Sequence, residues 1–501
     1  MVVWMGVAGG CGVDPGDGAT VSEAARPGRR VPRLIAPLST THTPNEEPLF
    51  VWELPPGAHR ARVEICSDRD CATPVMSFVA DGTSGRPPLR LPSGVDFWRV
   101  VALGPGHHES APSATWEIWA TGMHFPQPGL AGPPADTTWG SVLDVNGDGF
   151  ADLAVGSPGA GGGSLTIYFG GPAGPSPTPS QTFAGPRGFG VRLASAGDLN
   201  GDGFADLAVA AAGTPGRVFV YLGGPDGLSE RRTRLDPGPV TADFGSSSAV
   251  TYGDTLAPAG DVNQDGYADL LVGGREVAQV YFGGPNGVCP DAALALAGDD
   301  AGGGGAPNAT SVSGGADVNG DRLPDVMVQG HSYLGTGSGF TLQPDLTFQD
   351  GRFAGDVNGD GLTDYAGGSV FPGTPLGLSP TPQWSIPGQY FFTGTGDTNG
   401  DGFSEMFAST SDPWRVHYGN PLGCNQGADC GLPQNAVQTP GALPSPAGWT
   451  PVGDLNGDGL EDLAVGVPAD GAAYLFLAPD VPPVPSRTIN GAGSGFGTAV
   501  E

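Results

Sequence analysis

The chain of 501 residues contains no lysine, so arginine supplies all 21 of its basic side chains. Without lysine there is no Walker phosphate loop, no Schiff-base lysine and no pyridoxal phosphate site. The motifs Gly-x-Ser-x-Gly, His-Glu-x-x-His and Cys-x-x-Cys are also missing. These absences argue against several large enzyme classes, and we expect a protein that is not an enzyme.

No apolar run approaches the ~18 residues that a membrane-spanning helix needs. Residues 1–11 are apolar and end in small residues before Cys11, which resembles the end of a bacterial lipoprotein signal peptide. The basic segment that usually opens such a signal is missing, so an untethered N-terminus is the alternative. We therefore expect a secreted protein or a surface lipoprotein, attached to the membrane only through a lipid on Cys11 if one is present.

Positive charge is scarce, and the formal net charge is −31 with a pI near 4.2. This balance argues against nucleic acid as a partner. The 88 glycines and 51 prolines would usually suggest disorder. Strand-like runs nevertheless recur regularly between them, which favours an all-β protein with many tight turns.

One acidic pattern of nine residues occurs seven times, with oxygen-bearing side chains at positions 1, 3, 5 and 9. The copies begin at Asp144, Asp198, Asp261, Asp317, Asp356, Asp397 and Asp454. Position 3 is Asn146, Asn200, Asn263, Asn319, Asn358, Asn399 and Asn456. Position 5 is Asp148, Asp202, Asp265, Asp321, Asp360, Asp401 and Asp458. Position 9 is Asp152, Asp206, Asp269, Asp325, Asp364, Glu405 and Asp462.

Hard oxygen ligands at alternate positions can wrap one hard cation, and a glycine at position 6 permits the sharp turn that returns position 9. Without a cation, three crowded carboxylates repel one another or take up protons. The sequence therefore predicts Ca²⁺, up to seven ions with one in each loop. Seven divalent ions would reduce the formal charge from −31 to −17.

An EF-hand begins in the same way but requires a bidentate Glu at position 12. Here position 12 is a residue that cannot ligate: Val155, Val209, Val272, Val328, Gly367, Ala408 or Val465. After position 9 the pattern turns apolar, as in Asp152-Leu-Ala-Val, which predicts a buried strand and not an exiting helix. The EF-hand is excluded.

The copies begin about 52 residues apart on average, near the ~40–50 residues of a four-stranded propeller blade. A typical unit has a Phe-Gly opener, the acidic loop, a strand, and a second strand such as Val218-Phe-Val-Tyr-Leu. One sheet cannot bury both of its faces alone, whereas sheets packed around an axis can.

The run Phe189-Gly190 followed by Gly197-Asp-Leu-Asn-Gly-Asp-Gly-Phe-Ala-Asp206 resembles the FG-GAP repeat of integrin α-subunit propellers. The resemblance covers about 370 residues. It implies a seven-bladed β-propeller, with one Ca²⁺ in each hairpin loop between the first two strands of a blade. These ions would be mainly structural and lie away from the usual ligand face. It also implies that position 7 ligates through its backbone carbonyl: Phe150, Phe204, Tyr267, Leu323, Leu362, Phe403 and Leu460.

Several residues depart from the repeat. Gln264 precedes Asp265 in the third loop, and Arg322 replaces the glycine at position 6 of the fourth. Because position 6 favours φ > 0 and Arg322 adds positive charge, we expect the fourth loop to be the weakest calcium site. Residues 495–500 match a repeat opener without a loop after it. This tail either seals the ring against the first blade, whose opener Trp139-Gly140 is divergent, or marks a lost eighth blade.

The remaining organisation is read from composition. Residues 1–11 are the signal-like segment, 12–31 a flexible linker, 32–121 a small β-sandwich, and 122–501 the calcium-binding propeller. Seven short strand-like runs in 32–121, with Trp52, Trp98 and Trp116, resemble a fibronectin type III domain. We expect Trp52 and Trp98 in its core, and His107-His108-Glu109 on a solvated loop where a metal site is the weaker alternative.

Cysteine spacing supports export. Cys66 with Cys71, and Cys424 with Cys430, could each close a small loop as a disulfide in an oxidising compartment. Cys289 is left over, and we interpret it as an unpaired thiol. Neither pair has the spacing of a zinc site.

Two classes of function fit these patterns. The first, which we favour, is a surface-exposed, calcium-stabilised binding or adhesion module. We expect it to be a monomer and to bind an unidentified protein or glycan at the surface. The second is a carbohydrate-binding lectin, or a secreted enzyme, that uses a propeller face. Trp384 and Trp414 are the aromatic candidates for sugar stacking, but core packing is the interpretation that we favour for both. His331 and Ser332 are adjacent, so as neighbours on a strand they would point to opposite faces.

Overall fold

The computed structural model describes residues 3–4, 31–38, 41–43, 47–92, 94–104, 108–120, 142–159, 161–213, 216–236, 252–274, 277–297, 311–321, 323–341, 345–348, 351–385, 391–394, 396–399, 403–409, 415–419, 448–478, 485–491 and 495–501. All regular elements within these ranges are β-strands, and none of them is a helix. The described residues contain no helix with the length and apolarity to cross a membrane. The expectation of an all-β protein is confirmed.

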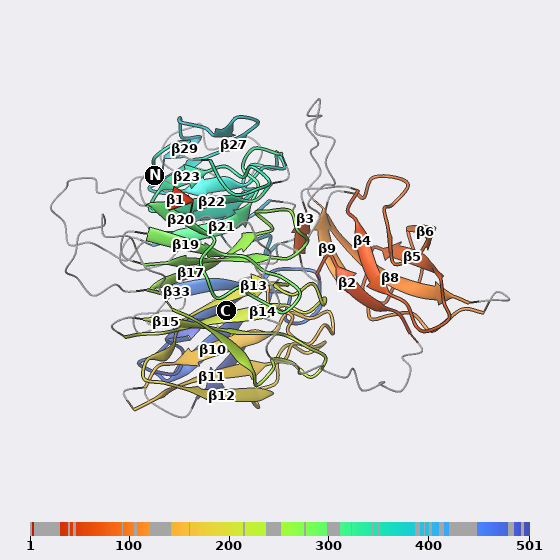
Figure 1. Ribbon diagram of the computed structural model, residues 1–501, viewed down its shortest axis with the longest axis horizontal. Helices are drawn as coiled ribbons and strands as arrows, with labels where there is room; N and C mark the ends of the chain where they lie inside the picture. Colours follow the sequence, from red (N-terminus) through yellow and green to blue (C-terminus); the bar gives the residue numbers. More distant parts are fainter. Residues whose placement is uncertain are drawn as a thin grey trace.

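Two sheets form the N-terminal part, which lies to one side of the remaining sheets (Figure 1). The first sheet has the order β2-β4-β7, and the second has the order β3-β9-β8-β5-β6. Their strands are β2 (Arg33–Ala36), β3 (Thr41–Thr43), β4 (Phe50–Glu53), β5 (Arg60–Cys66), β6 (Met76–Asp81), β7 (Ser84–Gly85), β8 (Gly94–Leu103) and β9 (Trp116–Ala120). We refer to this part, residues 33–120, as the sandwich; its relation to fibronectin type III domains stays a prediction.

Aromatic side chains fill the sandwich core, as expected for Trp52 and Trp98. Both are fully buried, and the Trp98 ring lies 4.6 Å from that of Phe50. Alternating apolar residues on β5, such as Val63 and Ile65, point to the same core. The predicted Cys66–Cys71 disulfide is present, with a Cα–Cα distance of 5.2 Å.

Seven further sheets each contain one acidic loop, in the described residues after 142. The first three are β37-β10-β11-β12, β13-β14-β15-β16 and β17-β18-β19-β20, the last extended by β1 (Val3–Trp4). Their strands are β10 (Leu153–Ser157), β11 (Gly163–Tyr168), β12 (Gln181–Gly185), β13 (Phe189–Gly197), β14 (Asp206–Ala211), β15 (Arg217–Tyr221), β16 (Arg232–Leu235), β17 (Thr255–Gly260), β18 (Asp269–Gly273), β19 (Val277–Tyr281) and β20 (Leu294–Ala297).

The other four sheets are β21-β22-β23, β24-β25-β26-β29, β30-β31-β32 and β33-β34-β35-β36. Their strands are β21 (Val312–Ala316), β22 (Asp325–Val328), β23 (His331–Tyr333), β24 (Arg352–Gly355), β25 (Asp364–Ala366), β26 (Ser369–Phe371), β29 (Trp384–Ser385), β30 (Phe391–Gly394), β31 (Met406–Ser409), β32 (Arg415–His417), β33 (Gly448–Gly453), β34 (Asp462–Val467), β35 (Ala472–Phe476) and β36 (Arg487–Asn490). A small hairpin, β27 (Gly373–Thr374) with β28 (Gly377–Leu378), accompanies the fifth loop.

The first strands of successive sheets contact one another, β13 to β17, β17 to β21, β21 to β24, β24 to β30 and β30 to β33. Their second strands carry fully buried apolar residues, such as Leu207, Val209, Leu270 and Val272. Packing of this kind hides both faces of each sheet, which is the arrangement of a β-propeller.

The C-terminal tail completes the first sheet and joins the two ends of this part of the chain. Strand β37 (Ala499–Val500) pairs with β10, with Val500 opposite Val155, and also contacts β13 and β34. Phe496 packs over Gly491 in the way that Phe189 packs over Gly185. The tail is therefore an opener that seals the ring against the first blade, which resolves the two alternatives left by the sequence.

One interpretation from the sequence is wrong: Cys289 is in a disulfide and is not an unpaired thiol. The expected core packing of Trp384 is confirmed, because it is buried beside Val370 in the fifth sheet and cannot stack a sugar from the surface. Cys11, Trp139, Gly140, Trp414, Cys424 and Cys430 lie outside the described residues.

Candidate metal centre

The second to seventh acidic loops each join the first strand of their sheet to the second, whereas the first loop precedes β10 in a sheet that β37 completes. Position 1 follows the first strand directly in the second, third, fourth, fifth and seventh loops, as Asp198 follows β13. Position 9 begins the second strand at Asp206, Asp269, Asp325, Asp364 and Asp462. This is the hairpin position that the family resemblance implied.

The carboxylate at position 1 closes the turn by accepting hydrogen bonds from backbone N–H groups. Asp144 accepts from the amides of Gly147 (2.7 Å) and Gly149 (3.0 Å). Asp454 accepts in the same way from Gly457 and from Gly459 (2.8 Å). Position 1 thus points into the loop in both blades.

Positions 3 and 5 face each other across the turn. The amide of Asn146 donates to Asp148 Oδ2 (2.9 Å), and Asp148 Oδ1 accepts from the Phe150 amide (3.0 Å). The same pair of contacts recurs at Asn456 and Asp458. The side chains that the sequence predicted as ligands are therefore brought together within each of these loops.

Position 9 is the most deeply buried acid of the loop. Asp206 is fully buried, and its two oxygens accept from the amides of Leu199 (2.8 Å) and Gly223 (2.8 Å). Because each carboxylate oxygen has two lone pairs, these bonds hold the strand and leave acceptor capacity toward the loop. Glu405 replaces this aspartate in the sixth loop and reaches the amide of Thr398 (2.7 Å).

Burial and mutual repulsion raise the pKa of the loop acids. Burial first, and then the charge of Asp148, raises the pKa of Asp144 to about 7. Burial, with smaller contributions from repulsion by Asp454 and Asp458, raises the pKa of Asp462 to about 9. These groups would keep protons at neutral pH unless a cation balances their charge.

No group of three or more His, Cys, Asp or Glu side chains in the described ranges is arranged so that it could hold a metal ion. The carboxylates of the loops accept hydrogen bonds from backbone N–H groups instead, as Asp144 and Asp206 do. The donor set nevertheless fits a hard cation in kind: three carboxylates, one carboxamide and the backbone carbonyls of a tight turn.

Neighbouring loops are linked by a hydrogen bond that the sequence does not reveal. The amide at position 8 donates to the position 1 carbonyl of the preceding loop: Ala151 to Asp454, Ala205 to Asp144, Ala268 to Asp198, Thr363 to Asp317, Ser404 to Asp356, and Glu461 to Asp397. Pro324 occupies position 8 of the fourth loop and has no N–H to donate. The link from the fourth loop to the third is the one that this sequence cannot make.

The side chain at position 7 also reaches the preceding loop. The Phe204 ring lies against Gly147, where an added Cβ would meet it at 2.8 Å. Tyr267 covers Gly201 and Phe150 covers Gly457 in the same way. Position 7 is therefore apolar because its side chain packs on a neighbour, in addition to the carbonyl role that the resemblance implies.

The departures from the repeat have structural counterparts. Gln264 has φ = 58°, in the position where other loops have a glycine with φ of 68–79°. Position 6 has φ of 83–94° at its described glycines, which supports the premise of the argument about Arg322. Arg322 and Asp401 themselves lie outside the described residues.

Other candidates from the sequence do not assemble into sites. Glu109 pairs with Arg62 (2.9 Å), and His107 lies outside the described residues. His331 is buried, and its Nδ1 lies 2.9 Å from Thr347 Oγ1.

The fold and the repeated loops define a propeller-type protein that carries FG-GAP repeats. The FG-GAP-like repeat model matches residues 144–209, and the FG-GAP repeat model matches residues 449–476.

Among curated proteins, the chain is similar to integrin alpha-IIb of Mus musculus, with 36% identity over 159 residues. That match covers 28% of this chain and 15% of the relative. Integrin alpha-3 of Mus musculus is 33% identical over 157 residues, which are 29% of this chain and 15% of the relative. The matched region is thus a small part of these relatives.

Among solved structures, BBS1N in complex with ARL6DN, soaked with mercury, aligns over 70% of this chain and 91% of that chain. The identity is 14% and the TM-score 0.37. A TM-score of this size carries no argument about fold or function.

Proposed function

We propose that the protein is a calcium-stabilised binding or adhesion module that works at the cell surface or after secretion. The observation that carries this proposal is the set of repeated acidic loops, in which buried carboxylates crowd together with raised pKa values. Such clusters are costly in the folded state unless a cation balances them. The similarity to integrin alpha chains supports a binding role over catalysis.

Calcium bound only by the folded chain would stabilise it by mass action. The loops resemble extracellular calcium modules, so we expect affinities of about 10⁻⁴ to 10⁻³ M. The ligand would be a protein or glycan at the surface. The Cys11 lipid is the proposed means of attachment.

Calorimetry of the full chain with calcium and with chelator tests the stabilisation. We expect chelator to lower the melting temperature and equilibrium dialysis to count several calcium ions per chain. Asp198→Asn, at position 1 of the second loop, should lose one ion. Asp226→Asn, an exposed acid outside the loops, should lose none. Equal melting in both conditions would refute the proposal.

The ligand itself requires a screen of glycan and protein arrays with and without calcium. Calcium-dependent capture of a protein supports adhesion. Capture of glycans alone would favour the lectin, although Trp384, one of its two aromatic candidates, is buried. Intact-mass analysis of the native protein tests the lipid, because retention of residues 1–11 would exclude it.

A further inference from the structure

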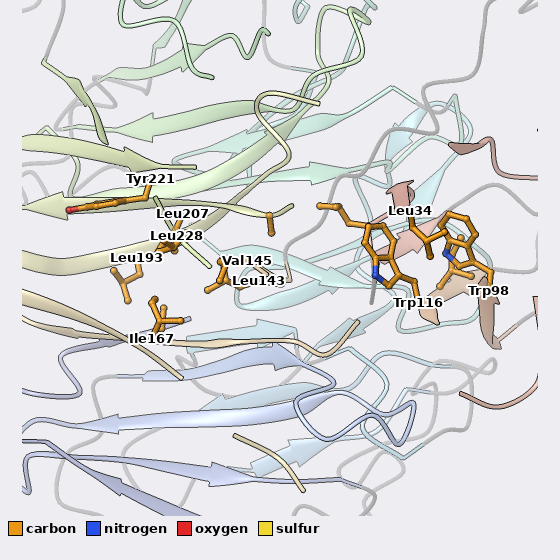
Figure 2. Packing of buried hydrophobic residues seen from close by; sticks show 14 of the residues in the cluster. Leu34, Trp98, Trp116, Leu143, Val145, Ile167, Leu193, Leu207, Tyr221 and Leu228 are labelled. Carbon is orange, nitrogen blue, oxygen red and sulfur yellow. The ribbon is translucent and has the colours of Figure 1, made fainter. Parts of the chain in front are cut away.

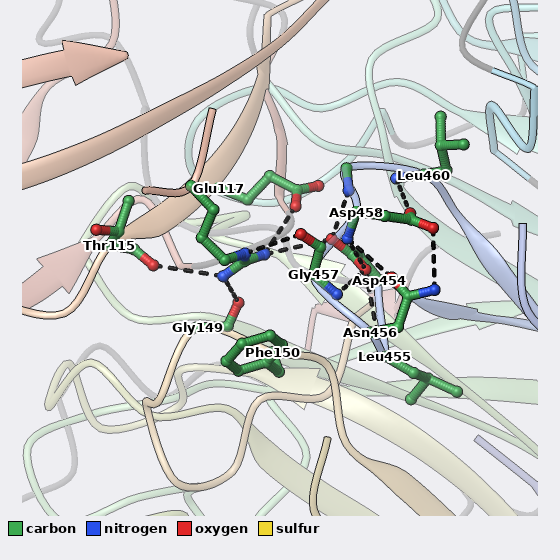
Figure 3. A network of polar contacts seen from close by, with 12 residues as sticks. Thr115, Glu117, Gly149, Phe150, Asp454, Leu455, Asn456, Gly457, Asp458 and Leu460 are labelled. Atoms are coloured by element: carbon green, nitrogen blue, oxygen red, sulfur yellow. Dashed lines mark hydrogen bonds and ion pairs between the residues drawn. The ribbon is translucent and has the colours of Figure 1, made fainter. Parts of the chain in front are cut away.

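Arg69 of the sandwich donates hydrogen bonds to both the first and the seventh acidic loops. Gly149 of the first loop and Gly457 and Asp454 of the seventh lie close together in Figure 3. It donates to the carbonyl oxygens of Gly149 (2.6 Å) and Gly457 (3.2 Å). It also lies 3.3 Å from the carboxylate of Asp454, at position 1 of the seventh loop, and 3.0 Å from Glu117 of the sandwich. Its guanidinium carbon is 4.5 Å from the centre of the Phe150 ring. One arginine therefore binds two loops that are more than 300 residues apart in the chain.

The second loop is held in a similar way by β2. Arg33 donates to the carbonyl of Asp202 and lies over the Phe204 ring at 5.4 Å. An added Cβ on Gly203 would meet Ile35 Cα at 2.8 Å. The sandwich thus rests directly on the backbone of the second loop.

Apolar packing joins the same two parts. The buried cluster that contains Leu34 and Trp116 of the sandwich also contains Leu143, which precedes the first loop, and Val145 of that loop (Figure 2). Trp116 is 2% exposed, and its Nε1 donates to the carbonyl of Gly147 (3.3 Å). The contact is a packed interface that covers part of these loops, including Gly149, while Asp148 and Asp458 remain exposed.

Covering part of these acidic loops costs free energy while no cation balances their charge. The first and seventh loops hold seven carboxylates, and with Glu117 and Arg69 the formal charge at this interface is −7. Two divalent cations would reduce it to −3. Burial of charge costs less when the charge is balanced, so filled loops are the better docking surface.

We propose that the sandwich is a cap whose docking on the first, second and seventh loops depends on the cations in those loops, with Arg69 as the linking residue. The inference rests on the proposed calcium binding. By reciprocity, docking strengthens calcium binding in the loops that it covers.

The test uses the full chain and measures its radius of gyration by small-angle X-ray scattering during a calcium titration. We expect a compact form with calcium and an expanded form with chelator. Arg69→Met should raise the calcium midpoint of compaction by about 5- to 150-fold. Arg231→Met, which changes an exposed arginine away from the loops, should leave it at the wild-type value.

A matched pair of glycines separates docking from loop strain. Gly149 and Gly266 both occupy position 6, with φ of 94° and 93°. An added Cβ would meet Thr115 O at 2.6 Å at Gly149, whereas at Gly266 nothing lies within 4 Å. Gly149→Ala should therefore raise the midpoint of compaction and Gly266→Ala should not.

Three outcomes overturn the inference. If dialysis shows bound calcium but the chain is equally compact without it, the coupling is wrong and the proposed function stands. If no calcium binds at all, both fail. If Gly149→Ala and Gly266→Ala behave alike, Arg69 and its neighbours do not link the cation to docking.

Discussion

Two residues in each acidic loop need a backbone conformation that L side chains rarely adopt. Position 4 has φ of 68–79° and position 6 has φ of 83–94° at the described glycines. Glycine reaches this region without strain, because it has no Cβ. Gln264 is the residue that bears the cost at position 4, with φ = 58°.

Gln264→Gly should therefore stabilise the calcium-bound protein by about 1 kcal/mol, the usual cost of this conformation for a side chain. Chemical unfolding in excess calcium measures the gain. Gln264→Ala keeps the strain and should bring no such gain. Equal effects of the two substitutions would show that the strain is not the cause.

Asp96 makes the sandwich sensitive to pH, independently of the loops. It is 4% exposed, its Oδ2 has no hydrogen-bond partner among the described residues, and burial raises its pKa to about 7. A raised carboxyl pKa favours the protonated folded state. Its contribution to stability is full below the unfolded value of 3.8 and is lost as the pH rises to about 7.

Asp96→Asn should remove this slope and stabilise the sandwich at pH 8 by on the order of 2 kcal/mol. Calorimetry of both proteins from pH 4 to 8 in excess calcium measures the difference between them. A difference that does not change with pH would contradict the assignment.

At the scale of whole loops, the bond from position 8 to the preceding loop makes neighbouring sites depend on each other. The Ala205 amide donates to the Asp144 carbonyl at 2.9 Å, and Phe204 covers Gly147 beside it. Through these two contacts, a change in the conformation of one loop alters the conformation of the next. Pro324 interrupts this chain of bonds between the third loop and the fourth.

Ala205→Pro should reproduce that interruption between the first loop and the second. Pro324 shows that the position accepts a proline ring, so the expected loss of about 1–2 kcal/mol reflects the missing hydrogen bond. Chemical unfolding in excess calcium measures it. Pro324→Ala is the reciprocal variant and should change stability little, since the bond that it allows is offset by the freer unfolded chain. If Ala205→Pro left the free energy of unfolding unchanged, the hydrogen bond from position 8 to the preceding loop would contribute nothing to stability.

At the scale of the whole molecule, two contacts between distant segments hold the parts together. Strand β37 closes the circle of sheets beside β10, and the sandwich packs on the loops through Trp116 and Arg69. Both join segments hundreds of residues apart, as Val500 with Val155 shows. Because the ring is closed in this way, each sheet in the described part of the ring packs between two neighbouring sheets.

Val500→Asp should open this closure, because it places a charge at a side chain that is 8% exposed and packed beside Val155. We expect a loss of roughly 2–4 kcal/mol, measured as a lower calorimetric melting temperature of the full chain. Leu376→Asp changes an apolar residue that is 87% exposed and should leave the melting temperature unchanged. A Val500→Asp protein that melts like wild type would show that β37 does not hold the ring.

Local chemistry determined what the sequence by itself could predict. Asp, Asn and Gly at fixed spacing specify the turn and its oxygen donors, because those contacts lie within nine residues, as from Asp144 to Asp152. The alternation of strands and turns predicted the all-β class for the same reason. Contacts between distant segments have no such local pattern. Only the tertiary structure decided that residues 495–500 close the first sheet, that Cys289 is in a disulfide, and that Arg69 lies between Gly149 and Gly457. Each depends on which surfaces meet when the chain buries its apolar area, and that is a property of the whole fold.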